Sequence, residues 1–167
     1  MKRIISILLI SLVLCLIFSS CNKDKGNDNS ESLAPDITVY SATGKAVSLS
    51  DLKGKAVVLN FFASWCPPCK AEMPAIQKAY EQYGNEVEFL IVNLVGWESG
   101  PTDGRVFIEG TDYTFPVYYD LDLTADQKYS FDSIPQTFFI DKDGNIADTH
   151  SGMISYLGLT NGIEKIK

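Results

Sequence analysis

Long apolar runs and helically spaced apolar positions alternate through the middle of the chain. Residues 56–62 and 87–94 are almost continuously apolar, which is typical of central strands that are covered on both faces. Between them, apolar residues recur at helical spacing and predict a helix that Gly84 ends. The residues at this spacing are Ala71, Met73, Ile76, Ala79 and Tyr80. Strands that alternate with helices in this way predict an α/β domain.

Shorter signals on either side complete the expected set of elements. Upstream, alternating residues predict two short strands at 37–40 and 47–49. Downstream, the pattern predicts a helix at 102–110, a strand at 115–119, a helical turn at 125–129 and a closing helix at 155–166. Residues 137–140 and 146–149 flank Asp141-Lys142-Asp143-Gly144-Asn145, a sequence rich in turn-forming residues. The domain is therefore expected to finish with an antiparallel hairpin and a helix.

The first 33 residues have a different character from the rest of the chain. Two basic residues precede the apolar run at residues 4–18, and residues 1–21 therefore resemble an export signal peptide. About fifteen apolar residues are short for a membrane span, which needs about twenty, although an uncleaved anchor is the alternative. Residues 22–33 are polar and predict a flexible tether. The folded domain is expected at residues 34–167.

Cys21 is a candidate lipidation site. The sequence Phe18-Ser19-Ser20-Cys21 resembles a bacterial lipobox, in which the cysteine is acylated and becomes the new N-terminus. The lipobox usually has Leu where Phe18 stands. Ordinary signal cleavage after Ser20 would place Phe18 at a position that prefers a small side chain. We therefore predict a lipoprotein rather than a soluble secreted form.

Charge and cysteine content narrow the possible functions. The chain has 167 residues and a formal net charge of −7. Removal of the leader, which contributes two basic residues and no acids, would leave about −9. A nucleic-acid partner is not expected, since phosphate binding needs clustered Lys and Arg. Of the four cysteines, Cys15 lies in the leader and Cys21 would carry lipid, so Cys66 and Cys69 remain as thiols. We expect a monomer that has no separate structural disulfide.

The strongest chemical signal is Trp65-Cys66-Pro67-Pro68-Cys69-Lys70, directly after the first apolar run. Two cysteines spaced this way, where a strand gives way to a helix, suit thiol–disulfide exchange. Half of a zinc site is one alternative, but zinc needs four ligands and His150 is the single histidine of the sequence. A static disulfide is the other alternative. We expect no metal and no cofactor beyond the Cys66–Cys69 pair.

Residues 59–74 resemble the active-site segment of the TlpA/ResA-like branch of the thioredoxin superfamily. Three further segments agree with that family in the family's order: Pro35-Asp36-Ile37 with residues 48–55, Phe115-Pro116-Val117, and residues 134–141. The resemblance spans most of residues 35–150. It implies a thioredoxin-like fold, with a central mixed sheet, helices on both faces and an N-terminal β extension.

The expected site combines helix chemistry with family roles. Cys66, at a helix N-terminus with an exposed sulfur, should have a lowered pKa and attack, while the more buried Cys69 resolves the intermediate. The resemblance implies a cis Ile134–Pro135 bond that faces the dithiol, with Ile134 pairing to an extended client. An ordinary loop proline is the alternative. The side chains of Trp65, Pro67 and Pro68 are assigned to client binding, although Trp65 could equally be a core residue.

Glu72 is the candidate proton carrier. In thioredoxins proper a buried Asp lies six residues before the first cysteine, but here that position is Asn60. The ResA-like branch instead places a glutamate at the position of Glu72. Glu72 follows Cys69 by three residues and should share its helix face. We expect Glu72 to tune the pKa of both thiols and to move a proton during exchange, and a solvated surface glutamate is the alternative.

These observations predict a thiol-disulfide oxidoreductase tethered at the extracytoplasmic face of a bacterial membrane. By resemblance, its partners are disulfide-containing exported proteins, such as apocytochrome c, and a membrane thiol-electron donor. A thiol peroxidase is one alternative. The peroxidase pattern Pro-x-x-x-Thr/Ser-x-x-Cys would need other residues at Leu59 and Ala63. A non-catalytic binding lipoprotein is the second alternative.

Overall fold

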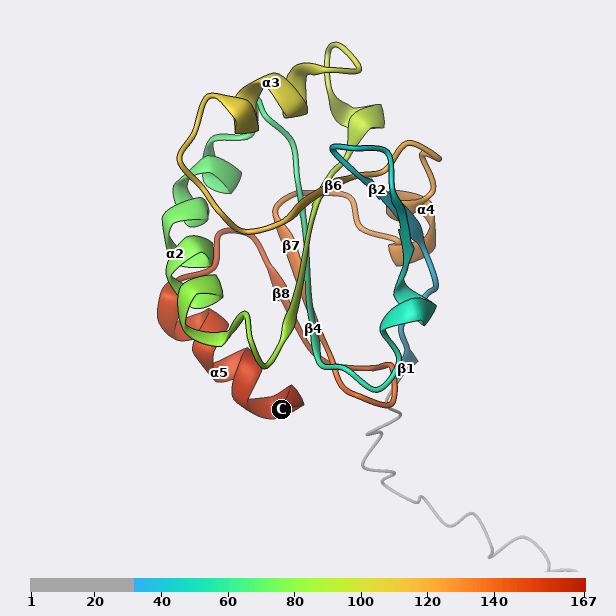
Figure 1. The fold of residues 1–167 in the computed structure, drawn as a ribbon, viewed down its shortest axis with the longest axis vertical. Coiled ribbons are helices and arrows are strands. Elements are labelled where there is room, and N and C mark those ends of the chain that lie inside the picture. The colour runs from blue at the N-terminus through green and yellow to red at the C-terminus, as the bar shows by residue number, and fades with distance from the viewer. Residues whose placement is uncertain (1–31) are drawn as a thin grey trace, which may run out of the picture. The chain divides into compact units, whose positions relative to one another are not determined.

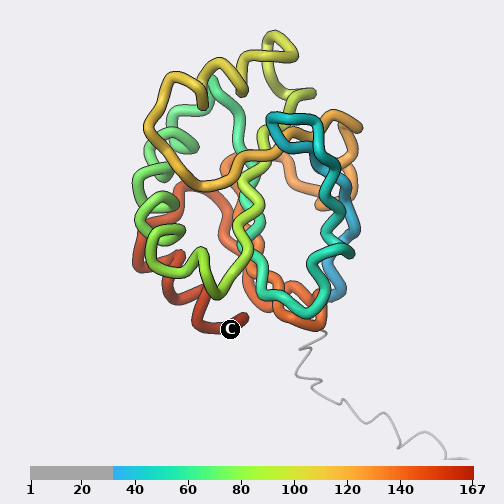
Figure 2. The backbone as a smooth tube through the Cα atoms, viewed as in Figure 1, coloured from blue at the N-terminus to red at the C-terminus, as the bar shows by residue number. Residues whose placement is uncertain are grey.

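The computed structural model describes residues 32–167 (Figures 1 and 2). The strands are β1 (Ser32–Leu33), β2 (Thr38–Ser41), β3 (Ala46–Ser48), β4 (Val57–Phe62), β5 (Glu88–Asn93), β6 (Val117–Tyr119), β7 (Gln136–Ile140) and β8 (Asn145–Ser151). The helices are α2 (Pro67–Tyr83), α3 (Asp103–Glu109), α4 (Ala125–Tyr129) and α5 (Tyr156–Ile166). Two 3₁₀ turns, η1 (Leu49–Leu52) and η2 (Val95–Trp97), lie between them.

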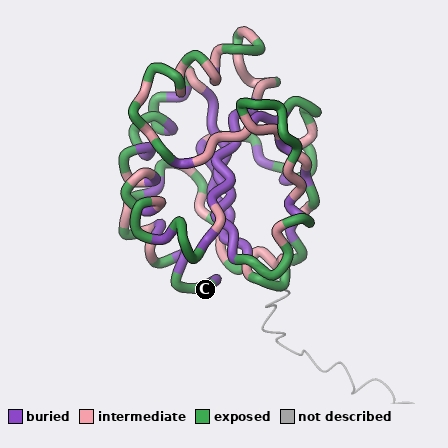
Figure 3. Tube along the Cα trace, in the orientation of Figure 1, coloured by how far each residue is buried: buried purple, intermediate pink, exposed green. Residues whose placement is uncertain are grey.

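All eight strands belong to one mixed sheet in the order β1-β8-β7-β4-β5-β6-β2-β3. Strand β4 lies at its centre, parallel to β5 and antiparallel to β7. Every residue of β4 is buried, which explains why its residues other than Asn60 are apolar, without alternation. The buried strands form the middle of the molecule in Figure 3. The predicted α/β class with a central mixed sheet is confirmed.

Two cores cover the two faces of β4. On one face, Val58 and Phe62 pack with apolar residues of α2 and α5. On the other, Leu59 and Phe61 pack with α4 and with the N-terminal strand β2. Figure 1 shows α2 and α5 on one side of the sheet and β2 and α4 on the other. Because both faces are covered, β4 is a rigid support for whatever follows its C-terminal end.

The predicted elements are present, with shifts at their ends. Helix α4 has the predicted bounds, while β6 begins at Val117, after Pro116, which has no amide proton to donate. Residue 49, predicted as the end of a strand, starts η1 instead, and Asp51 accepts a 3.0 Å hydrogen bond from the amide of Ser48 there.

The N-terminal boundary also differs from the prediction. Ser32 and Leu33, which we assigned to the tether, form β1 and pair with β8. The remaining tether residues 22–31 and the predicted leader at 1–21 lie outside the described residues. Within residues 32–167, no helix has the length and apolar character needed to cross a membrane.

Candidate dithiol site

The strand-to-helix junction places the cysteine pair at the N-terminus of α2. Cys66 is the residue that caps the helix, and Pro67 and Pro68 occupy its first two positions. Proline fits there because amides of the first turn have no partner within the helix. The amide of Cys69 donates a 3.2 Å hydrogen bond to Cys66 Sγ. The sulfur of Cys66 is thus held where helix amides favour negative charge.

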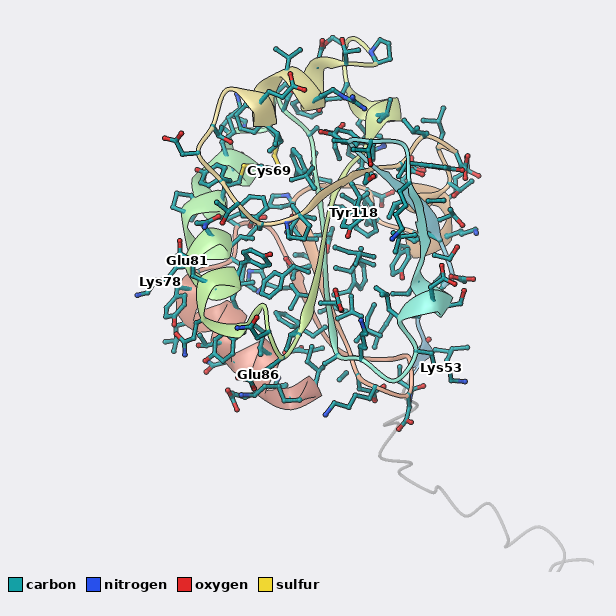
Figure 4. The ribbon with its side chains drawn as sticks, viewed as in Figure 1. Lys53, Cys69, Lys78, Glu81, Glu86 and Tyr118 are labelled. Carbon is teal, nitrogen blue, oxygen red and sulfur yellow. A yellow bond between two sulfur atoms is a disulfide. The ribbon has the colours of Figure 1, made fainter. Side chains whose placement is uncertain are left out.

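Cys66 and Cys69 form a disulfide with a Cα–Cα distance of 5.3 Å. Cys69 lies near the end of α2 that faces α3 (Figure 4). Cys69 is buried as expected, at 0% exposure, but Cys66 is also buried at 2%, so the prediction of an exposed Cys66 sulfur is wrong for this disulfide form. The disulfide bond to Cys69 keeps the Cys66 sulfur close to α2. The segment around Ile134 lies next to this sulfur.

The peptide bond between Ile134 and Pro135 is cis, as the resemblance implied. The carbonyl oxygen of Ile134 lies 3.8 Å from Cys66 Sγ, across a sequence separation of 68 residues. Pro135 is buried, and its carbonyl accepts a 2.9 Å hydrogen bond from the amide of Gly152. The half-buried Ile134 therefore faces the disulfide from a segment that is anchored behind it.

The rim of the site is apolar and accessible. Trp65 is 52% exposed, so a core role for its side chain is excluded. Its indole Nε1 donates a 2.6 Å hydrogen bond to the carbonyl of Trp97 in η2. Pro67 and Pro68 are also exposed. The structure thus gathers Trp65, both prolines and Ile134 around the dithiol.

Glu72 lies inside the protein, one helical turn beyond Cys69, with an exposure of 1%. The alternative of a solvated surface glutamate is excluded. Its Oε1 accepts a 2.8 Å hydrogen bond from Asn60 Nδ2, and its Oε2 accepts one of 2.9 Å from the amide of Ile154. Burial raises the pKa of Glu72 from 4.5 to about 7, although these two hydrogen bonds act in the opposite direction. A carboxyl group that titrates near neutral pH can both accept and release a proton in the working range.

Sequence reasoning missed Glu98. Its carboxylate accepts hydrogen bonds from the amide of Ser64 at 2.6 Å, from Ser64 Oγ at 2.7 Å and from Asn93 Nδ2 at 2.6 Å. Ser64 immediately precedes Trp65, so Glu98 fixes the segment that leads into the dithiol. A signal for this contact did exist. Parallel strands β4 and β5 end at the same edge of the sheet, so the residues after them lie together.

The described ionisable residues outside the site do not form a metal-binding cluster. His150 lies half-buried on β8, with Nε2 3.2 Å from the carbonyl of Met153. In the part of the chain from residue 32 onward, no group of three or more His, Cys, Asp or Glu side chains is placed to hold a metal ion.

This chain is similar in sequence to known thioredoxin-like proteins and thiol-disulfide oxidoreductases. The profile of the AhpC/TSA family matches residues 31–149. The chain is 38% identical over 123 residues to thioredoxin-like protein YneN of Bacillus subtilis, covering 73% of this chain and 71% of that protein. It is 35% identical over 156 residues to the thiol-disulfide oxidoreductase ResA of Oceanobacillus iheyensis, covering 90% and 80%.

Solved structures share the fold. StoA from Bacillus subtilis superposes with a TM-score of 0.69 at 29% identity, covering 78% of this chain and 98% of StoA. The exposed lipoprotein thioredoxin Etrx1 from Streptococcus pneumoniae gives a TM-score of 0.69 at 31% identity, covering 77% and 98%. The expected thioredoxin-like fold is confirmed.

Proposed function

Since this chain belongs to the AhpC/TSA family and is a TlpA/ResA-like thiol-disulfide oxidoreductase, we propose that it reduces disulfide bonds of exported proteins through Cys66 and Cys69. One observation carries the proposal. The Cys66–Cys69 disulfide lies at the N-terminus of α2, and the carbonyl of Ile134 faces it at 3.8 Å. This arrangement supports an exchange site rather than a structural crosslink.

The reaction consists of two thiol–disulfide exchanges. In the reduced protein, the Cys66 thiolate attacks one sulfur of a client disulfide, and the other client sulfur leaves as a thiolate. Cys69 then attacks the Cys66 sulfur of the mixed disulfide, which releases the second client sulfur and forms the Cys66–Cys69 bond. Two electrons pass to the client. A membrane thiol-electron donor restores the dithiol by the reverse exchange.

Glu72 supplies the proton acceptor for this sequence. Cys69 must lose its proton before it can attack, because the thiolate is the nucleophile. Glu72 lies one turn further along α2, is shielded from water, and has a pKa of about 7 in the disulfide form. Its role is to take the Cys69 proton and to return it during re-reduction.

The client binds as an extended segment. The main chain at Ile134 is available next to the disulfide, and an extended peptide can add to it by main-chain hydrogen bonds. The exposed Trp65, Pro67 and Pro68 provide an apolar rim that does not require a particular client side chain. Such a surface suits several exported clients, of which apocytochrome c with its haem-attachment cysteines is one.

The protein acts at the extracytoplasmic face of a bacterial membrane, as a monomer tethered by acylated Cys21. The leader pattern at residues 1–21 supports export. Etrx1, to which this chain is similar, is described as an exposed lipoprotein. The described residues begin at Ser32, and the polar segment 22–31 lies between them and Cys21 in the sequence.

Trapping of client intermediates tests the proposal. In the Cys69→Ala variant, the mixed disulfide at Cys66 cannot be released, so exported proteins should accumulate in disulfide-linked complexes that disappear on reduction. The matched control is Cys66→Ala, which retains the buried Cys69 and should trap few or none. Equal trapping by the two variants, or none by either, would overturn the proposal. Peroxide consumption by the reduced wild-type protein distinguishes the thiol peroxidase alternative.

A further inference from the structure

The side chain of Asn60 is a buried amide whose nitrogen makes two hydrogen bonds and whose oxygen makes none. It lies on β4 with 1% exposure, on the same face as Val58 and Phe62, toward α2. Its Nδ2 donates to Glu72 Oε1 at 2.8 Å and to Thr137 Oγ1 at 3.0 Å. Its Oδ1 is buried and has no hydrogen-bond partner among the described residues, and it is the one such side-chain atom there.

The unpaired Oδ1 of Asn60 is an acceptor that a protonated Glu72 could use. An ionised carboxylate needs hydrogen-bond donors, which Asn60 Nδ2 and the amide of Ile154 provide. A protonated carboxyl group carries its own O–H and needs an acceptor. The unpaired acceptor belongs to the same amide that already contacts Glu72. Rotation of that amide by half a turn would exchange its donor for its acceptor.

We propose that Asn60 is a positioning residue whose amide orientation follows the charge of Glu72, donating to the carboxylate and accepting from the carboxylic acid. Thr137 can follow the rotation because a hydroxyl group both accepts and donates. In the rotated state, Thr137 Oγ1 donates to Asn60 Oδ1 instead of accepting from Nδ2. The inference rests on the proton-carrying role proposed for Glu72 and names the group that adjusts the proton affinity of that carboxyl group.

Few charged groups compete with Asn60 for control of Glu72. Strands β4 and β7, which form the sheet beneath it, carry no ionisable side chain. Cys66 and Cys69 are joined in a disulfide and do not titrate in this form. The ionisable residues on the other elements packed around Glu72 are Lys70, Lys78, Tyr80, Glu81 and Tyr83 on α2, Asp148 and His150 on β8, and Tyr156, Glu164 and Lys165 on α5. Lys165 is paired with Asp148, and the hydroxyl of Tyr156 donates to Gln82. The hydrogen-bond donors to the carboxylate are the neutral groups of Asn60 and Ile154.

The first test measures the titration of Glu72 by carbon NMR of its carboxyl group in the oxidised protein. Asn60→Leu removes the donor and leaves a side chain of similar size. Because a hydrogen bond to a charged group favours the charged form, its loss should raise the pKa of Glu72 by about one to two units. Thr137→Val leaves the Asn60–Glu72 bond in place and frees one amide proton. It should move the pKa by less than Asn60→Leu does.

The second test follows the Asn60 side-chain amide itself by nitrogen NMR. In the wild-type protein, its two N–H resonances should shift with pH at the midpoint of the Glu72 titration, because the amide exchanges one set of partners for another. In Glu72→Gln, the same resonances should not titrate. Asn60→Ser is the second variant if Asn60→Leu does not fold, and it should shift the pKa in the same direction.

Two results would overturn the inference. One is a Glu72 pKa that stays within about 0.3 units of wild type in a folded Asn60 variant, well below what one lost bond to a charge produces. The other is an Asn60 amide that does not respond to the titration of Glu72. Failure of the proposed function is seen separately, by trapping with Cys69→Ala and by the pH dependence of exchange in Glu72→Gln. Neither of those readouts depends on Asn60.

Discussion

The indole nitrogen of Trp65 donates a hydrogen bond of 2.6 Å to the main-chain carbonyl of Trp97. Trp65 precedes the first cysteine of the dithiol, and Trp97 lies in η2, the turn that follows β5. The side chain of Trp97 extends the connection, because its Nε1 donates to Asp126 in α4 at 2.9 Å. The rim of the dithiol is therefore attached to the opposite face of the sheet, and its position depends on η2 as well as on α2.

We expect Glu98 to hold Ser64 and Trp65, which lead into the dithiol, in a fixed conformation. Glu98→Gln replaces a charged acceptor of three hydrogen bonds by a neutral group whose nitrogen cannot accept. Hydrogen bonds to charged groups are worth about 1.5–3 kcal/mol each, so we expect a loss of about 2 kcal/mol in the free energy of unfolding. Amide hydrogen exchange at Ser64 and Trp65 should accelerate in the variant. Unchanged exchange at those two amides would contradict the anchoring role of Glu98.

The control for this measurement is Glu109→Gln. Glu109 is an exposed glutamate at the end of α3, so its substitution changes the charge by the same amount without touching Ser64. It should leave both the free energy of unfolding and the exchange rates near the wild-type values.

Gly104 should matter because it leaves room for Asn93. A Cβ atom at Gly104 would overlap with Asn93 Oδ1, and Asn93 is the residue whose Nδ2 donates to Glu98. Gly104→Ala must displace this buried amide, which we expect to cost about 1–3 kcal/mol and to loosen the Glu98 contact. Thermal unfolding and amide exchange at Ser64 provide the measurement. In Gly110→Ala, the nearest atom to the new Cβ would be 3.4 Å away, so this control should change little.

Most of the fold is predictable from the sequence because its main elements have local signals. The nearly continuous apolar runs of β4 and β5, the capping prolines of α2 and the turn residues between β7 and β8 all act within a few residues. Ser32 and Leu33 lack such a signal. They form a strand because β8 offers them a partner more than a hundred residues away.

In the site, too, the features with a local sequence motif could be predicted, and those that depend on distant contacts could not. Cys66, Cys69 and the cis Ile134–Pro135 bond could be placed from sequence, since each belongs to a recognisable motif. The burial of Cys66 could not, because it depends on where the distant Ile134 carbonyl lies. The sequence also identified Asn60 as unable to carry a proton, but its contact with Glu72 and its unpaired oxygen appear only in three dimensions.

The proposed lipid anchor predicts a simple chemical change. In the producing bacterium, Cys21→Ser should abolish the incorporation of labelled fatty acid into the protein, because the acylated residue would be lost. The matched control is Cys15→Ser, which lies inside the apolar part of the leader and should leave the labelling unchanged. Immunoprecipitation with an antibody against the folded domain, followed by measurement of the label, gives the answer. Both variants behaving alike would contradict lipidation at Cys21.

Burial of Glu72 predicts an unusual dependence of stability on pH. The pKa of Glu72 is raised from 4.5 in an unfolded chain to about 7 in the folded protein, so the folded state binds more protons between these values. The contribution of Glu72 to the free energy of unfolding should therefore fall as pH rises from 4.5 to 7, by about 3 kcal/mol in total, and should level off above. Urea unfolding of the oxidised protein at several pH values measures this change. Glu72→Gln should flatten it, whereas Glu81→Gln, on the exposed side of the same helix (Figure 4), should not. A wild-type slope equal to that of Glu72→Gln would show that the carboxyl group titrates normally and would remove the basis for its role as proton carrier.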